Sequence, residues 1–313
     1  MSVNASTERH PFASLLLLLL LVFSGAIVFT FLGALLGALI YGTSDLFEFL
    51  AGNYKANIAL TKLLQIASST GMFVVPALVF ARLENKNWRD YLQLNRVSGI
   101  LLLFTVLLMF GSTPLLELSV ELNKGMKLPS FLQNLEIWMQ NKEAQMADLT
   151  RQLLIMKSLP VLLVNLLMLA VLPAFGEEFI FRGCLQRIFT RLTHNYHLAV
   201  WISAIIFSAI HVQFYGFFPR MLLGALFGYL LVWSKSLWLP ILAHFVNNAT
   251  AVITAYVYQQ KGLPLEKLEQ TEPTPWPLYL FSAFFTILLL VYIYRLGRKQ
   301  HFIEENTNGT KLG

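Results

Sequence analysis

A succession of long apolar runs, separated by short gaps, is the feature that most constrains this chain. About 20 apolar residues are enough to cross the hydrocarbon core of a bilayer as a helix. Counting apolar windows predicts eight such helices, near 12–41, 57–82, 98–118, 158–189, 197–214, 217–234, 237–258 and 276–295. Of the 313 residues, 56% are hydrophobic and only 13% are charged. We therefore predict an all-α, polytopic transmembrane bundle that forms one integral membrane domain over residues 1–313.

The first apolar run resembles the core of a signal peptide, because it begins with leucines directly after Ser14. It is too long for that role. Apolar character continues through Ile40, whereas such a core has roughly 7–15 residues, and no small-residue cleavage pattern interrupts it. We expect a retained first span.

The net charge of +6 indicates orientation, because the basic residues gather in alternate gaps. Basic clusters fall near 82–96, 187–191, 235 and 295–299, whereas the gaps at 45–48, 119–157 and 259–275 are mixed or acidic. The positive-inside rule places the basic side in the cytoplasm, and an even number of spans places both termini there. This pattern predicts a lipid bilayer and no nucleic acid as partner.

The longest connection, 119–157, is predicted to be an extramembrane amphipathic segment. Its apolar residues recur every three or four positions, at Leu132, Leu135, Met139, Met146, Leu149 and Leu153. That spacing is typical of a helix with one apolar face. The favoured interpretation is a helix that caps the bundle; a substrate lid or a partner surface is the alternative.

Three of the apolar runs are interrupted by polar side chains, which are expensive at membrane depth. An ionised or histidine side chain there costs roughly 3 kcal/mol on insertion scales. The interruptions are Glu177, Glu178 and Arg182 in one run, His211 in a second, and His244 and Asn248 in a third. A chain that places several such groups in its spans is expected to use them together, so we predict a buried polar site on three core helices.

Helical spacing separates these residues into pairs. Glu178 and Arg182 are four apart and share a helix face, whereas Glu177 is rotated by about 100°. A Glu178–Arg182 pair would neutralise a buried charge and leave Glu177 free to act as a base or ligand. For the pair, a charged helix end with a snorkelling arginine is an equally good interpretation. His244 and Asn248 are also four apart and can project into one interior space.

Two kinds of chemistry fit this set of residues. A carboxylate and an imidazole that share a water form a general-base pair, while a second imidazole and a carboxamide can stabilise an oxyanion. Alternatively, Glu177, His211 and His244 could bind zinc with an open position for water. The single Cys184 excludes a thiolate site, and no zincin or serine-hydrolase motif is present. The residues leave the two alternatives open.

The order Glu177-Glu178-x-x-x-Arg182, Phe207-x-x-x-His211, His244-x-x-x-Asn248 resembles the motifs of the CPBP intramembrane proteases. That family includes the type II CAAX prenyl endopeptidases and bacteriocin-processing or immunity homologues. The resemblance covers about 158–258, which we take as the catalytic core. It implies that Glu177 and His211 activate water, that His244 and Asn248 form the oxyanion hole, and that Glu178 and Arg182 support them. The family is usually described as metalloproteases, although a metal-free glutamate mechanism has also been argued.

The sequence therefore predicts an intramembrane endopeptidase, or metalloprotease if zinc is bound, in a bacterial plasma membrane. Its partner would be a peptide or protein substrate at the membrane, including prenylated or lipid-bearing ones. The alternative is a non-catalytic membrane protein, either a proton-coupled transporter or an immunity or interaction protein. Transport predicts symmetry between the two halves, and the polar residues show none.

Overall fold

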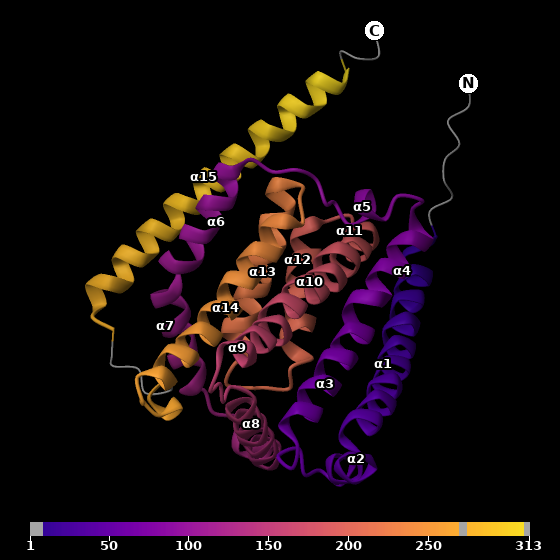
Figure 1. The fold of residues 1–313 in the computed structure, drawn as a ribbon. Helices are drawn as coiled ribbons and strands as arrows, with labels where there is room; N and C mark the ends of the chain where they lie inside the picture. Colours follow the sequence, from indigo (N-terminus) through magenta and orange to yellow (C-terminus); the bar gives the residue numbers. More distant parts are fainter. Residues whose placement is uncertain (1–8, 269–273, 310–313) are drawn as a thin grey trace.

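The computed structural model describes residues 9–268 and 274–309, and this part of the chain is helical without strands (Figure 1). Five helices are long and apolar enough to cross a membrane: Pro11–Tyr41, Ile58–Glu84, Leu159–Thr193, Phe217–Ser234 and Trp276–Lys299. A sixth is formed if a bent pair of helices counts as one span. The predicted all-α integral membrane bundle is confirmed, whereas the predicted count of eight spans is not.

The helices follow one another along the chain with short connections. The α-helices are α1 (Pro11–Tyr41), α2 (Thr43–Leu50), α3 (Ile58–Ser69), α4 (Val75–Glu84), α5 (Trp88–Tyr91), α6 (Gly99–Gly111), α7 (Thr113–Lys124), α8 (Gln133–Leu153), α9 (Leu159–Leu166), α10 (Leu172–Glu178), α11 (Gln186–Thr193), α12 (Tyr196–Ala209), α13 (Phe217–Ser234), α14 (Trp238–Gln260) and α15 (Trp276–Gly309). Three π-helical segments, η1 (Thr70–Val74), η3 (Leu167–Val171) and η4 (Phe179–Leu185), join α-helices within longer spans, and two 3-10 turns are η2 (Ser130–Leu132) and η5 (Leu265–Leu268).

Three predicted spans are not among these five helices. The span predicted at 237–258 does form one helix, α14, but it is not apolar enough to count among the candidate membrane helices, since it carries His244, Asn247 and Asn248. The span predicted at 98–118 is broken between α6 and α7, which are bent by 42° at Ser112. Pro114 in the first turn of α7 explains the break, because proline starts helices well but cannot continue one. The span predicted at 197–214 ends at Ala209, so α12 has only 14 residues.

The helices that carry or adjoin the predicted site residues, α10, α12 and α14, lie in the middle of the bundle (Figure 1). On one side α1 packs against α3 and α4, and on the other side α15 packs against α6 and α7. Between them, α10 contacts α14 and α12 contacts α13. Large apolar side chains of α1 remain exposed, including Phe23, Ile27 and Phe31, as expected for a helix that faces lipid.

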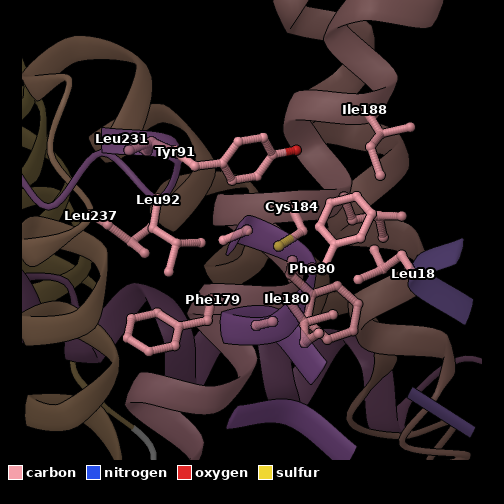
Figure 2. Packing of buried hydrophobic residues seen from close by; sticks show 14 of the residues in the cluster. Leu18, Phe80, Tyr91, Leu92, Phe179, Ile180, Cys184, Ile188, Leu231 and Leu237 are labelled. Atoms are coloured by element: carbon pink, nitrogen blue, oxygen red, sulfur yellow. The ribbon is translucent and has the colours of Figure 1, made fainter. Parts of the chain in front are cut away.

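The largest apolar cluster packs the site-bearing span against α1, α4 and the loop around Leu92 (Figure 2). Cys184 is a buried member of this cluster, next to Phe80, so it serves as a packing residue. Tyr91 also lies here, and burial raises the pKa of its phenol well above the ordinary value. Close packing continues at Gly176, where a Cβ would lie 2.8 Å from Cβ of Phe73.

Hydrogen bonds tie the loops into two groups at opposite ends of the bundle (Figure 1). At one end Arg187 donates to the Tyr91 carbonyl, and Asn95 donates to the Lys235 carbonyl. We call this the basic end. At the other end, Asn123 donates to the carbonyl of Phe214, so the loop after α12 is held by the end of α7. The helix α8 lies at this second end, as does α2. The prediction that both termini are cytoplasmic concerns residues 1–8 and 310–313, which lie outside the described residues.

Candidate active site

Glu177 and Glu178 lie at the end of α10, inside the 35-residue helical span Leu159–Thr193. A π-helical segment precedes α10 and another follows Glu178 directly. A π-bulge widens the helix by one residue and turns the side chains that follow, and such bulges are frequent at functional sites. The site therefore lies where the span departs from regular α-helical geometry.

Glu178 is fully buried and receives two hydrogen bonds on the same oxygen. Arg182 Nη1 lies 2.7 Å from Glu178 Oε1, and His244 Nδ1 lies 2.8 Å from it. The first contact joins residues four apart on one helix, and the second joins α10 to α14. Because the acceptor is a carboxylate, both bonds are charge-assisted or strongly polarised. Glu178 thus fixes both the arginine and the histidine ring.

The guanidinium of Arg182 is enclosed by aromatic rings and a carbonyl group. Its Cζ lies 4.6 Å from the ring centre of Phe207 and 5.4 Å from that of Phe227. Its Nη2 donates to the carbonyl oxygen of Gly224 at 2.9 Å. These contacts from α12 and α13 hold a cation that is only 1% exposed, so Arg182 does not snorkel to the surface.

His244 is placed between the two glutamates. Its Nδ1 is bonded to Glu178, and its Nε2 lies 3.8 Å from Glu177 Oε2. The ring is stacked on Phe227 with 5.3 Å between ring centres, which restricts its rotation. A hydrogen bond to a carboxylate places the Nδ1 proton on that bond and leaves Nε2 toward Glu177. The side chain of Glu177 is 13% exposed, in contrast to Glu178.

His211 lies just beyond the end of α12, not within a helix. Its Nδ1 donates to the carbonyl oxygen of Phe207 at 2.8 Å, which leaves Nε2 as a proton acceptor. The ring packs edge-on against Phe207, which also contacts His244. Among the hydrogen bonds of the described residues, none joins His211 to Glu177. The Phe207 ring therefore packs against both histidine rings.

Asn248 lies one turn beyond His244 on α14. Its Nδ2 donates to the carbonyl oxygen of Leu169 at 3.0 Å, and its Oδ1 accepts from Asn247. Leu169 belongs to the π-helical segment η3, so the carboxamide joins α14 to an irregular part of the site-bearing span. One of the two amide protons is used in this bond, and the other is available to a ligand.

Arg220 is a site residue that the sequence reasoning missed. Its Nη2 donates to Gln213 Oε1 at 2.5 Å, while its buried Nη1 has no hydrogen-bond partner in the described structure. The guanidinium interacts electrostatically with Glu177 and with His211. A signal existed in the sequence: Arg220 is a single cation in the first turn of an apolar helix, remote from the basic loops.

The arrangement of the site residues bears on whether they could bind a metal. Among residues 9–268 and 274–309, no group of three or more His, Cys, Asp or Glu side chains is arranged to hold a metal ion. Glu177, His211 and His244 therefore do not form a zinc site as they are placed. The zinc alternative stays a prediction.

Comparison with known proteins identifies the segment that carries these residues. Residues 159–250 match the family model described as type II CAAX prenyl endopeptidase Rce1-like. The uncharacterized protein YpbD of Bacillus subtilis (strain 168) is 30% identical over 89 residues, which is 27% of this chain and 42% of YpbD. The match thus spans less than half the length of that curated relative. No solved structure matches the chain.

The matched segment contains all six predicted site residues: Glu177, Glu178, Arg182, His211, His244 and Asn248. The resemblance to type II CAAX prenyl endopeptidases is therefore confirmed over this segment. The individual roles of the six residues stay predictions. The family model does not cover the parts outside this segment, including α1 to α8 and α15.

Proposed function

We propose that this chain is an intramembrane endopeptidase of the CAAX type, which hydrolyses a peptide bond in a membrane-associated substrate. Prenylated or otherwise lipid-bearing peptides are the substrate class that the family match favours. The observation that carries the proposal is the arrangement of His244 between Glu178 and Glu177. A transporter or an immunity protein gains no comparable support from the site.

Glu177 is the proposed general base. Its carboxylate oxygen and His244 Nε2 are 3.8 Å apart, too far for a hydrogen bond but close enough for one water to bond both at about 2.8 Å. His211 offers a second acceptor, because its Nδ1 is occupied by the Phe207 carbonyl. In this mechanism Glu177 and His211 orient the attacking water, and Glu177 accepts its proton as the oxygen bonds to the carbonyl carbon. The protonated Glu177 then delivers that proton to the leaving amine nitrogen as the C–N bond breaks.

His244 and Asn248 are the proposed oxyanion donors. When both His244 nitrogens carry protons, Nδ1–H stays on Glu178 and Nε2–H is available to the developing oxyanion. The second amide proton of Asn248 can donate alongside it. Glu178 and Arg182 act as positioning residues, since they hold the His244 ring in place without facing the substrate.

The test is cleavage of a fluorescence-quenched, farnesylated CAAX reporter peptide by the purified protein in proteoliposomes. We expect Glu177→Gln to lower the rate by about 100-fold or more, because general-base catalysis contributes about 10²–10⁴. Glu48→Gln, a matched carboxylate change on α2, should leave the rate unchanged. A folded Glu177→Gln protein that cleaves at the wild-type rate would refute Glu177 as the base.

We also propose that the membrane is the bacterial plasma membrane and that the basic end faces the cytoplasm. Arg9 at the start of α1 and Arg298 near the end of the α15 span lie at this end. The positive-inside rule then places both chain termini in the cytoplasm.

A further inference from the structure

A polar cavity lies at the basic end of the bundle, and Arg182 is one of its lining residues while His244 is not. It has a volume of about 620 Å³ and is bounded by α11, α13, α15 and the loop that holds Gln93. Its cationic lining residues are Arg182, Arg187, Arg191, Lys235 and Arg298. None of the lining residues is acidic. We call this cavity the basic pocket.

Carboxylates compensate part of this charge from outside the lining. Glu178 pairs with Arg182 at 2.7 Å, and Glu84 lies 3.7 Å from Arg191. Lys235 and Arg298 come from different elements, the turn after α13 and the helix α15, and converge on the same cavity. Cations gathered around a cavity without acidic lining produce a local positive potential, which attracts an anion.

Two buried lining residues present polar atoms that the protein does not satisfy. Arg182 Nε and Gln186 Oε1 have no hydrogen-bond partner, although both residues are more than nine-tenths buried. Both side chains line the pocket, but the two atoms themselves are closed off from solvent, and Gln186 Oε1 lies 2.8 Å from the position that a Cβ on Gly228 would take.

The rest of the lining fits the headgroup region of a membrane. Tyr196, Trp233 and Tyr294 lie in the pocket wall, the first two at the ends of α12 and α13 and Tyr294 near the end of the apolar span Trp276–Lys299. Tyrosine and tryptophan are enriched at this level of a bilayer. Basic pockets between transmembrane helices are known to bind phosphate-bearing lipid headgroups. We propose that the basic pocket binds a phosphate anion, either as the phosphate of an anionic phospholipid headgroup or as free phosphate.

The test measures binding to the full-length, detergent-purified protein. The probes are short-chain phosphatidylglycerol, short-chain phosphatidylcholine and inorganic phosphate, titrated by isothermal calorimetry at two salt concentrations. We expect saturable phosphatidylglycerol binding that weakens with salt. The double variant Lys235→Gln/Arg298→Gln should bind at least about tenfold more weakly, because each cation near the surface contributes to attraction of anionic lipid.

The matched control removes two cations from the same end but outside the pocket: Lys86→Gln/Arg89→Gln should bind as wild type does. The variant Lys235→Arg/Arg298→Lys keeps both charges and should bind as the wild type does. This result would show that the Gln variant binds weakly because it has lost charge and not because it has misfolded. Competition by inorganic phosphate supports recognition of phosphate itself, and binding of phosphatidylglycerol alone supports a lipid headgroup. The proposal would be overturned if the Lys235→Gln/Arg298→Gln and Lys86→Gln/Arg89→Gln variants lost phosphatidylglycerol affinity equally. It would also be overturned if neither phosphatidylglycerol nor inorganic phosphate bound saturably.

Discussion

Removal of the Glu178 charge is predicted to destabilise the protein strongly. Glu178 Oε1 accepts from Arg182 Nη1 at 2.7 Å and from His244 Nδ1 at 2.8 Å, and all three side chains are buried. Glu178→Gln keeps the shape but leaves the guanidinium without its counter-ion. A buried charge that has lost its partner destabilises a protein because neither water nor an opposite charge compensates it.

The magnitude follows from what remains around Arg182. Removing one partner of a buried ion pair costs about 3–5 kcal/mol. The Gly224 carbonyl and the rings of Phe207 and Phe227 stay in contact with the guanidinium, and cation–π contacts retain up to about 2 kcal/mol. We therefore expect the lower end of the range, about 3 kcal/mol of unfolding free energy.

The assay is a double-mutant cycle on the detergent-purified protein. Unfolding free energies come from titration with sodium dodecyl sulfate, followed by circular dichroism. Glu178→Gln and Arg182→Met are measured separately and together. Because the double variant removes both charges, we expect it to be less destabilised than the sum of the single variants by at least about 1 kcal/mol.

An additive result would refute this reasoning. If the two single effects sum to the double effect within about 0.5 kcal/mol, the residues do not interact energetically in the folded protein. Glu48→Gln, an exposed carboxylate on α2, is the control for loss of a negative charge and should change the unfolding free energy by less than about 0.5 kcal/mol.

Two further predictions concern packing and loop attachment. Gly176→Val should cost about 1–3 kcal/mol in thermal unfolding, because its Cβ would lie 2.8 Å from Cβ of Phe73, whereas Gly99→Ala has open space and should be tolerated. Gln259→Leu should cost about 1–3 kcal/mol and increase hydrogen exchange near Met156, because Gln259 accepts from the Met156 amide at 2.8 Å; protection equal to wild type would contradict this.

The apolar pattern alone predicts the class of fold and several helix ends. The run predicted at 12–41 corresponds to α1, Pro11–Tyr41, because an uninterrupted apolar run of that length has few alternatives to a membrane helix. The bend between α6 and α7 was not predicted. A hydropathy window averages over Ser112 and Pro114 and cannot distinguish one straight helix from two bent ones.

The end of α12 shows a second limit. The residues up to 214 are apolar enough to extend a predicted helix, but α12 ends at Ala209 and Val212 adopts a left-handed conformation with φ of 52°. The Ser208 hydroxyl donates to the Phe217 carbonyl and closes this loop. Such a bond depends on where the next helix begins, which local sequence does not determine.

Within the site, spacing explains the local contact and not the distant ones. The Glu178–Arg182 contact follows from residues four apart on one helix. The bond from His244 to Glu178 joins residues 66 positions apart, so it depends on how α14 packs against α10. Arg220 was missed for a related reason: its electrostatic interaction with Glu177 depends on how α13 packs against its neighbours.

The Glu178–Arg182 pair also bears on why a membrane protein keeps charges in its core. Well-packed apolar residues of similar volume are often as stable as a buried ion pair, or more stable, so stability alone does not account for it. Apolar replacements, however, could not hold His244 by its Nδ1 or direct Nε2 toward Glu177. Arg182 also lines the basic pocket, so one guanidinium both pairs with Glu178 and borders the proposed anion site. Both observations favour a functional explanation for the charges over a structural one.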